Sequence, residues 1–376
     1  MKTLFLYLTA FAGTGGIEKF NRAFMKALCD LHQDDPARLQ ILSVYDTSTD
    51  PRYAAPGVFR GFTQKKARFA FQAVRAASSA DTIILGHINL APVGLLIKRM
   101  FPGKQVLLVA HGIEVWRVTS PVQRAFIRKA DHILAVSEYT RTRMLQNDPA
   151  LNPRKIQVFY NTLDPYFAFP TRFGKPGYLL QRYGFAPETK IILTIARLSD
   201  TEKYKGYDKV IEALPGVLRA APGAVYLLCG KYRPAEKERV DDLIRWHGLE
   251  KSVVVPGFVK DEELIDHYLL ADVFVMPSKN EGFGIVFIEA LACGLPVIAG
   301  NQDGSVEALR HGELGILVNP EEVSEIGCAL TVTLTNPATD KAHQQAQVAG
   351  HFGFKPYKQR LRNLFTPASE PLVFQR

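Results

Sequence analysis

Short apolar runs alternate with helical patterns along almost the whole chain, and no other feature restricts the fold as much. Such alternation predicts parallel sheets built from β-α-β units. In the first half the expected strands are Thr3–Leu8, Leu39–Tyr45, Thr82–Leu85, Gln105–Val109, His132–Val136 and Ile156–Phe159. Helical patterns such as Ile17–Leu31 and Val93–Met100 lie between these runs.

A stretch rich in proline, glycine and aromatic residues, from Asn161 to Pro187, interrupts the alternation and is typical of a linker between domains. A second series of runs follows, with expected strands Ile191–Ile195, Val225–Leu228, Ser252–Val255, Val273–Met276, Pro296–Ala299 and Gly315–Leu317. With 376 residues the chain is too long for one ordinary core. We therefore expect an α/β fold with two doubly wound domains, at residues 1–165 and 175–350, and a ligand in the cleft between them.

Several classes of protein are disfavoured by composition. No window approaches 18 uncharged apolar residues, so no transmembrane helix is predicted. The apolar start, Met1–Ala10, lacks a basic lead and a cleavage site and is not interpreted as a signal peptide. The four cysteines match no metal or redox spacing, and we expect them to be small apolar residues in a reducing cytosol. They are Cys29, Cys229, Cys293 and Cys328.

The positive charge is concentrated in the first half of the chain. Residues 1–175 hold 24 Lys and Arg against 12 Asp and Glu, whereas the net charge of the whole chain is +9. Cations and bulky apolar residues are interleaved at 65–71 and 124–129, which suits a helix touching anionic lipid, although a solvated helix face is an equally ordinary interpretation. No nucleic-acid-binding motif is present, so we expect no nucleic acid and favour a membrane surface as the anionic partner.

A glycine loop, Ala12 to Glu18, follows the first expected strand and opens a helix. Such loops let a phosphate approach the backbone N–H groups at a helix N-terminus. A dinucleotide site is the competing interpretation, with Asp46 as its ribose acid. Glu18 stands where that fingerprint needs its third glycine, and a carboxylate would repel a pyrophosphate, so dinucleotide binding is disfavoured.

Two cations flank the loop after the strand Ile191–Ile195. Arg197 closes the strand, and Lys205 precedes the next helix. Cations at the carboxyl end of a strand are well placed to hold a diphosphate leaving group. For either residue alone a solvated side chain is the simpler explanation.

The segment Glu281 to Ala290 is the most informative part of the sequence. It follows the strand Val273–Met276 and opens an apolar helix whose first N–H groups, Phe283 to Val286, have no helical partner. Glu289 lies inside this helix, where an unpaired charge is costly, and a ribose diol is a reasonable partner for it.

The spacing of the two glutamates argues against glycoside hydrolysis. Eight residues correspond to about 12 Å at helical rise, whereas retaining glycosidases hold their carboxylates roughly 5 Å apart. The pair instead fits the two ends of one extended ligand, with sugar at Glu281, diphosphate at the helix N-terminus and ribose at Glu289. His111, at the end of the strand Gln105–Val109, is a candidate for bonding the sugar or assisting proton transfer, with a structural role as the alternative.

Together these residues resemble glycosyltransferase family four, a retaining group with the two-domain GT-B fold. The resemblance covers nearly the whole chain, and its most specific motif is the run from Glu281 to Glu289. The segments that carry it are Gly15-Gly16-Ile17-Glu18, His111-Gly112, 135–140, Ala196-Arg197-Leu198 to Lys205-Gly206, 256–259 and Glu281-x7-Glu289.

The resemblance implies a role for each matching residue. Arg197 and Lys205 would hold the diphosphate, Glu289 the ribose, and Glu281 and His111 the transferred sugar. The remaining donor-binding residues would be Gly15, Gly16, Gly257, Phe258, Val259, Gly282, Phe283, Gly284 and Ile285. Arg197 and Lys205 are farther apart than the family's usual spacing, so Lys203 could share the phosphate role. The C-terminal helix, at about 354–376, would return to the first domain.

We therefore expect a cytoplasmic, metal-independent retaining hexosyltransferase without a cofactor, in peripheral contact with the inner face of the cytoplasmic membrane. Its donor would be a UDP- or GDP-sugar. Its acceptor would be a glycan or a polyprenyl-diphosphate-linked precursor in exopolysaccharide or lipopolysaccharide synthesis. The alternatives are a nucleotide-sugar epimerase or phosphorylase of the same fold, and a non-catalytic sugar-nucleotide-binding module.

Overall fold

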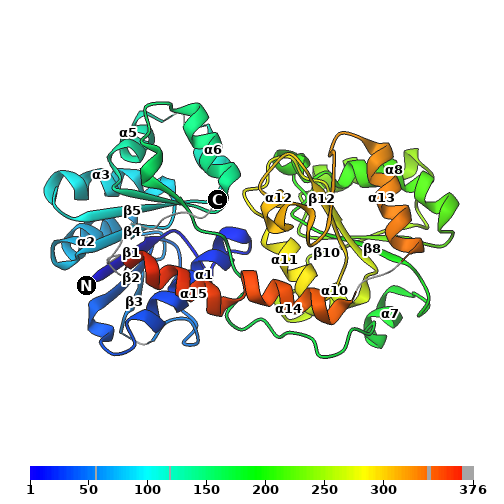
Figure 1. Ribbon diagram of the computed structural model, residues 1–376, viewed down its shortest axis with the longest axis horizontal. Coiled ribbons are helices and arrows are strands. Elements are labelled where there is room, and N and C mark those ends of the chain that lie inside the picture. The colour runs from blue at the N-terminus through cyan, green and yellow to red at the C-terminus, as the bar shows by residue number, and fades with distance from the viewer. Residues whose placement is uncertain (56, 118–119, 337–339, 366–376) are drawn as a thin grey trace. The chain divides into compact units, whose positions relative to one another are not determined.

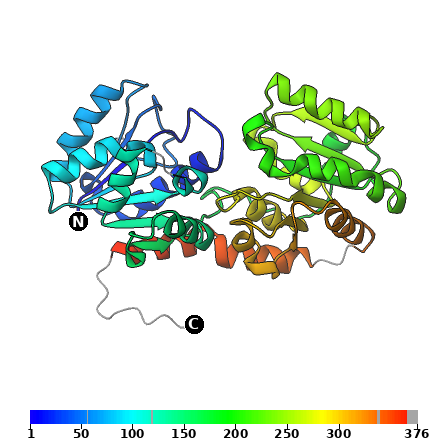
Figure 2. The ribbon, with the colours of Figure 1, turned by 90° about the horizontal axis from the view of Figure 1, so that it is seen from above.

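The computed structural model divides into two compact units (Figures 1 and 2). The first comprises Met1–Tyr166 and the C-terminal segment from Phe352, and the second comprises Phe167–His351. The structure describes residues 1–55, 57–117, 120–336 and 340–365. Each unit contains one parallel sheet with helices on both faces.

The first unit is built on a sheet of seven parallel strands in the order β3-β2-β1-β4-β5-β6-β7. Parallel strands that are covered on both faces need near-continuous apolar sequence, which explains the short apolar runs. The strands are β1 (Thr3–Tyr7), β2 (Leu39–Ser43), β3 (Phe59–Gly61), β4 (Thr82–Leu85), β5 (Gln105–Ala110), β6 (His132–Ala135) and β7 (Ile156–Val158).

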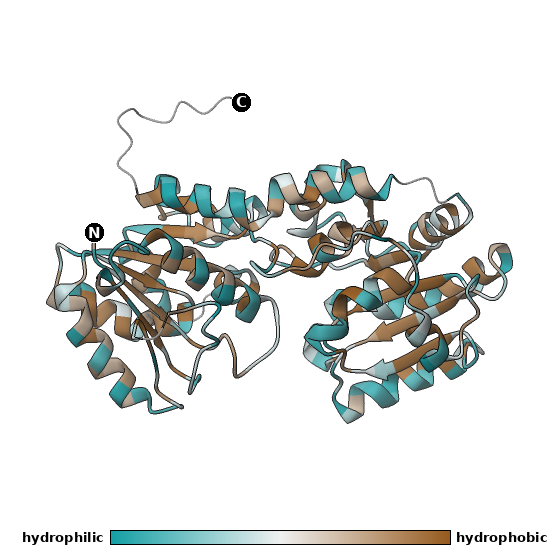
Figure 3. Cartoon of the chain, turned by 90° about the horizontal axis from the view of Figure 1, so that it is seen from below, coloured by the Kyte–Doolittle hydropathy of each residue, from teal (hydrophilic) through white to brown (hydrophobic). Residues whose placement is uncertain are grey.

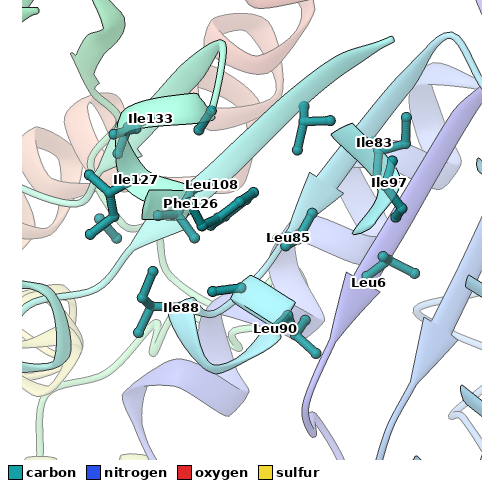
Figure 4. Packing of buried hydrophobic residues seen from close by; sticks show 14 of the residues in the cluster. Leu6, Ile83, Leu85, Ile88, Leu90, Ile97, Leu108, Phe126, Ile127 and Ile133 are labelled. Atoms are coloured by element: carbon teal, nitrogen blue, oxygen red, sulfur yellow. The ribbon is translucent and has the colours of Figure 1, made fainter. Parts of the chain in front are cut away.

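Alternate residues of β1 point into two different helical layers. Leu4 and Leu6 belong to the core beneath α2, α3 and α5, part of which Figure 4 shows. On the other face, the ring centroid of Phe5 lies 5.1 Å from that of Phe24 in α1. The helices of this unit are α1 (Gly16–Leu31), α2 (Lys66–Ser79), α3 (Ala91–Met100), α4 (Ile113–Trp116), α5 (Pro121–Lys129), α6 (Glu138–Asn147) and α15 (Phe354–Phe365).

The second unit has six parallel strands in the order β10-β9-β8-β11-β12-β13. Most of its strands are drawn in the brown of hydrophobic residues in Figure 3. They are β8 (Ile191–Ile195), β9 (Val225–Cys229), β10 (Val253–Gly257), β11 (Val273–Met276), β12 (Val297–Gly300) and β13 (Ile316–Val318). The helices are α7 (Gly177–Tyr183), α8 (Tyr207–Ala220), α9 (Pro234–Trp246), α10 (Leu264–Leu270), α11 (Ile285–Ala292), α12 (Ser305–Ala308), α13 (Val323–Thr335) and α14 (Lys341–Phe352).

The two faces of this second sheet pack against different sets of helices. Ile192, Tyr226 and Val275 share a core with α8, α9 and α13. The opposite face carries Phe274, whose ring centroid lies 5.9 Å from that of Phe287 in α11. Helix α11 therefore lies directly over the strand whose carboxyl end it follows.

The expected strands agree with the structure apart from small shifts at their ends, with one strand missed. Edge strand β3 is only three residues long and contains no apolar run, so the pattern gave no signal for it. Within the segment 161–187, which was predicted to be a linker between domains, Gly177–Tyr183 form helix α7. That helix ends at Gly184, whose left-handed φ of 68° is a common way to stop a helix.

The C-terminal helix α15 packs on the first unit. Lys358 bonds Asp30 of α1 at 2.9 Å, and the Tyr357 ring lies 4.7 Å from that of Phe159. The predicted helix extended to residue 376, and its part beyond 365 lies outside the described residues. In the described part of the chain, no helix combines the length and apolar character needed to span a bilayer.

Candidate active site

Strand order fixes where each sheet can bind a ligand. In the second sheet the chain runs from β8 outwards to β9 and β10, and then crosses back to β11 on the other side of β8. The strand order therefore reverses between β8 and β11. A crevice forms at the carboxyl ends of the strands at such a switch point, and it is the usual ligand site of doubly wound sheets. The loops that follow β8 and β11 meet there. They carry Arg197 and Lys205 on one side and Glu281 on the other.

The centre of this site is an ion pair between Lys205 and Glu281. The Lys205 Nζ lies 2.7 Å from Glu281 Oε2, and both side chains are less than one-fifth exposed. Burial alone would lower the pKa of Lys205, but the Glu281 carboxylate outweighs it, so the pKa is raised. Lys205 therefore remains a cation across the physiological pH range, as a partner for phosphate oxygens must.

Backbone contacts hold the two loops against each other. Gly206 has a left-handed φ of 76°, and a Cβ atom there would lie 2.3 Å from the Pro277 carbonyl oxygen. Only glycine fits this conformation and this space. The Lys279 N–H donates to the Tyr204 carbonyl at 3.1 Å. The approach of main chain to main chain thus brings Lys205 to Glu281.

Arg197 is at the site but is bound differently. Its Nε lies 3.0 Å from Glu202 Oε1, and its side chain is 61% exposed. The residues between the two cations form a 3-10 helix, Asp200–Lys205, which explains the long spacing from Arg197 to Lys205. Lys203 is exposed on this helix, whereas Lys205 faces Glu281. Glu202, for which the sequence gave no distinguishing signal, is thus the partner of Arg197.

Helix α11 begins later than the sequence suggested. Its first residue is Ile285, and Gly284 adopts a left-handed φ of 84° before it. Residues 281–284 are therefore not helical, and the helical estimate of the Glu281–Glu289 separation does not apply to that segment. A Cβ at Gly284 would lie 2.4 Å from the Phe287 ring, so glycine is required there. Gly282 and Phe283 are both buried beside the N-terminus of α11.

Glu289 has a partner within the protein. It is 2% exposed, and the Tyr268 hydroxyl donates to its Oε2 at 3.0 Å. The partner that the buried charge was expected to need is therefore present within the protein, in Tyr268 of α10. The role of Glu289 in binding ribose stays a prediction.

The third predicted segment lies farther along the same edge. Gly257 ends β10, which is separated from β8 by β9. Its carbonyl accepts from the Gly230 N–H at 2.7 Å. Phe258 is 53% exposed, whereas Val259 is nearly buried. An exposed ring at this place can pack against a flat ligand group, which is compatible with the predicted role of this segment in donor binding.

In the first unit, the glycine loop is held by Asp46. This buried carboxylate accepts from the N–H groups of Ala10, Phe11 and Ala12 at 2.9, 3.1 and 2.8 Å. It also accepts from the Ser43 hydroxyl at 2.9 Å. Since Asp46 stabilises the loop itself, it is not placed to bind a ribose, and the dinucleotide interpretation loses its acidic residue.

The remainder of that loop leaves the backbone accessible. Helix α1 begins at Gly16, with Gly15 as its N-cap. A Cβ atom at Gly16 would meet nothing within 4 Å. The Glu18 carboxylate lies beside Gly13 instead, with its Oε1 3.1 Å from where a Cβ atom of Gly13 would stand. Gly16 is therefore an open position, and its predicted approach to phosphates stays a prediction.

His111 lies where β5 ends, as expected, and its ring is fixed. Its Nε2 is 2.8 Å from the Gly86 carbonyl oxygen. A carbonyl only accepts, so Nε2 carries the proton and Nδ1 of the neutral ring is left as an acceptor. Burial lowers the pKa of His111 to about 4, as it does for the neighbouring His87. His111 can thus accept a hydrogen bond from a hydroxyl, but it is not a proton donor near neutral pH.

The described residues contain no group of three or more His, Cys, Asp or Glu side chains arranged to hold a metal ion.

Comparison with known proteins gives the family. Residues 15–167 match the model described as Glycosyltransferase Family 4, and residues 179–350 match that of Glycosyl transferases group 1. The chain belongs to glycosyltransferase family four. The two matched segments coincide closely with the two units of the fold.

Individual relatives agree with this family. The chain is 32% identical over 260 residues to a GDP-mannose-dependent α-(1-6)-phosphatidylinositol monomannoside mannosyltransferase of Mycobacterium tuberculosis. That alignment covers 65% of this chain and 64% of the relative. An enzyme of the same name from Mycolicibacterium smegmatis is 28% identical over 86% of each chain.

A solved structure shares the GT-B fold. Anabaena HepE, crystallised in complex with UDP, superposes with a TM-score of 0.75 at 21% identity. The superposition covers 97% of this chain and 99% of HepE.

The state of His111 leads to a pH prediction. In the unfolded chain the His111 imidazole takes up a proton near pH 6.5, whereas in the folded protein its pKa is about 4. Between these values the unfolded state binds more protons, so stability should fall as the pH is lowered through this window. NMR of ¹³C-labelled histidine, with the signal assigned by His111→Gln, should show no protonation of His111 between about pH 8 and pH 5.5. A midpoint near 6.5 would contradict the fixed neutral ring.

Proposed function

We propose that this protein is a retaining, metal-independent hexosyltransferase that uses a UDP- or GDP-hexose donor. The observation that carries the proposal is the meeting of Arg197, Lys205 and Glu281 with the N-terminus of α11 at the switch point of the second sheet. This is one site with cations, a helix N-terminus and a carboxylate. A nucleotide sugar has the matching parts: a diphosphate and a neutral, hydroxyl-rich hexose.

The ion pairs suggest how the donor is received. Lys205 is bonded to Glu281, and Arg197 to Glu202. A diphosphate entering the site would attract both cations, because charge-assisted bonds to phosphate are among the strongest available. Moving Lys205 towards the phosphate would release the Glu281 carboxylate to accept bonds from sugar hydroxyls. The leaving diphosphate would then be stabilised by Lys205, Arg197 and the first N–H groups of α11.

The stereochemical part of the proposal rests on the family. We infer front-face displacement, in which the acceptor hydroxyl attacks the sugar carbon from the side of the leaving phosphate. The bond from that carbon to the diphosphate oxygen breaks, and the hydroxyl proton passes to the leaving diphosphate. His111 would act only as a hydrogen-bond acceptor for the sugar.

The relatives suggest which donor to test first. The two mycobacterial relatives are named as GDP-mannose-dependent, and Anabaena HepE has also been crystallised with UDP-glucose. We therefore propose GDP-mannose as the first candidate and UDP-glucose as the second. An epimerase would convert the donor without an acceptor, a phosphorylase would need free phosphate, and a binding module would do neither.

The donor proposal predicts a defined set of outcomes. GDP-mannose or UDP-glucose should raise the melting temperature, because a ligand that binds only the folded state stabilises it. NMR of the product should show the anomeric configuration of the donor, and EDTA should leave the rate unchanged.

Arg197→Ala should lower turnover by about 100-fold or more, because the leaving-group charge loses a partner.

A matched control is Arg233→Ala, which removes an exposed arginine paired with Asp200 on the same 3-10 helix. It should change turnover less than about threefold, since exposed pairs contribute little. Inverted configuration, loss of activity with EDTA, or equal effects of the two arginine variants would each contradict the proposal.

We propose further that the first unit binds an anionic membrane and that the acceptor is lipid-linked. Helices α2, α3 and α5 pack side by side on one face of the sheet (Figure 1). Their 33 residues include eight Lys or Arg and no Asp or Glu. We call their outward-facing residues the basic surface. Its exposed cations include Lys66, Arg68, Arg75, Arg99 and Lys129.

Apolar side chains are exposed among these cations. Phe71 of α2 is 71% exposed, and Leu96, Met100 and Val122 are each exposed by more than 40%. Arg68 and Arg75 lie one turn before and after Phe71 on the same helix face. Bulky apolar tips surrounded by cations suit the boundary between lipid headgroups and acyl chains. A cytoplasmic enzyme with this surface would meet acceptors such as polyprenyl-diphosphate-linked glycans or phosphatidylinositol glycolipids.

Charge reversal tests the membrane contact. Arg68→Glu/Arg75→Glu should reduce binding to vesicles containing phosphatidylglycerol at least about tenfold, because each cation near the surface contributes about 1 kcal/mol. The control Arg219→Glu/Lys251→Glu makes the same charge change at exposed positions of the second unit. Co-sedimentation measures both. Binding that is equally reduced in the two variants, or equal binding to neutral phosphatidylcholine vesicles, would contradict a specific role for the basic surface.

A further inference from the structure

A buried carboxylate, Asp303, lies directly behind the loop that carries Glu281. It is on the connection between β12 and α12 and is only 2% exposed. Nothing in the sequence distinguished it from a surface loop acid. Burying a charge is costly unless it is fully hydrogen-bonded, so the partners of this carboxylate show what it stabilises.

The side chain of Asp303 bonds the loop that carries Glu281 and the start of α12. Its Oδ2 accepts from the Ser278 hydroxyl and from the Glu281 N–H, each at 2.7 Å. Its Oδ1 accepts from the Ser305 N–H at 2.9 Å and from the Ser305 hydroxyl. One side chain therefore joins the start of α12 to the loop between β11 and α11.

The next residue completes the attachment of Glu281. The Gly304 N–H donates to the Glu281 carbonyl at 2.9 Å, so both main-chain polar groups of Glu281 are bonded to this connection. A Cβ at Gly304 would lie 2.2 Å from the Gly282 carbonyl oxygen. The two loops are thus in direct main-chain contact, and Glu281 has little freedom to shift.

We propose that Asp303 is a positioning residue that fixes the main chain of Glu281 so that its side chain is directed at the transferred sugar. The inference rests on the proposed role of Glu281. Asp303 bonds the Ser278 hydroxyl and the Glu281 main chain, whereas Lys205 on the opposite loop bonds the Glu281 side chain. Asp303 thus sets where the Glu281 backbone lies, while Lys205 sets where its unliganded side chain points.

The structure predicts that Asp303 affects turnover more than nucleotide affinity. In Asp303→Asn an amide NH2 replaces one carboxylate oxygen and faces a main-chain N–H, that of Glu281 or that of Ser305, so one end of the link between α12 and the Glu281 loop is lost. A displacement of about 1 Å at a reacting group can cost about 100-fold in rate. We expect kcat to fall about 100-fold, whereas the Kd for GDP or UDP should change less than about threefold, because Lys205, Arg197 and the ribose contacts are retained.

The experiment measures kcat with GDP-mannose or UDP-glucose, whichever is turned over, and the Kd of its nucleoside diphosphate by calorimetry. Glu321→Gln is the matched control, because it removes the surface partner of Lys279 in the same loop without touching Asp303. This variant should behave like the wild type. If Asp303→Asn does not fold, Ser278→Ala, which removes one donor to the carboxylate, should still lower kcat several-fold.

The outcomes separate this inference from the proposed function. Glu281→Ala is measured in parallel, and unchanged turnover in that variant would remove the sugar role of Glu281 itself. An inactive Glu281→Ala with wild-type kcat in Asp303→Asn would overturn the inference about Asp303 alone. Equal losses of kcat and nucleotide affinity in Asp303→Asn would also overturn it, since they would indicate general disruption of the site.

Discussion

The largely buried ion pair between Lys205 and Glu281 is the interaction on which the candidate site depends. Each residue comes from a different loop, and the loops follow neighbouring strands on the two sides of the switch point. Neither charge would be favourable in this partly buried place without the other. The pair therefore couples the position of the cation to that of the carboxylate, and it gives the site a defined state before a donor arrives.

Glycines and one buried carboxylate make this pairing possible. Gly206 and Gly304 allow main chains to touch on either side of the Glu281 loop, where any side chain would collide. Asp303 then supplies acceptors for N–H and hydroxyl donors that this close packing removes from water. Asp46 acts in the same way at the glycine loop of the first unit. In both units, a buried aspartate stabilises a loop at the carboxyl ends of the strands.

Much of this arrangement could be predicted from the sequence, because apolar runs and strand-end motifs are local signals. The alternation gave nearly all the strands, and the motifs placed Arg197, Lys205 and Glu281 at strand ends. Edge strand β3 was missed because Phe59–Gly61 has no apolar run. The start of α11 was misplaced because a left-handed Gly284 leaves no clear sequence signal. The partners Tyr268 and Asp303 could not be found, since each lies on another element that the fold brings to the site. Glu202 is close to Arg197 in sequence, but their pairing depends on the 3-10 helix between β8 and α8, which the sequence did not indicate.

The central claim is that binding of a diphosphate breaks the ion pair between Lys205 and Glu281, so that the Glu281 carboxylate can accept hydrogen bonds from the sugar. A crystal structure of the protein with GDP or UDP and its hexose donor tests this most directly. We expect the diphosphate to lie at the N-terminus of α11, with the Lys205 Nζ bonded to a phosphate oxygen and the Glu281 carboxylate bonded to sugar hydroxyls. A nucleotide bound elsewhere, with the Lys205–Glu281 pair still intact, would contradict it.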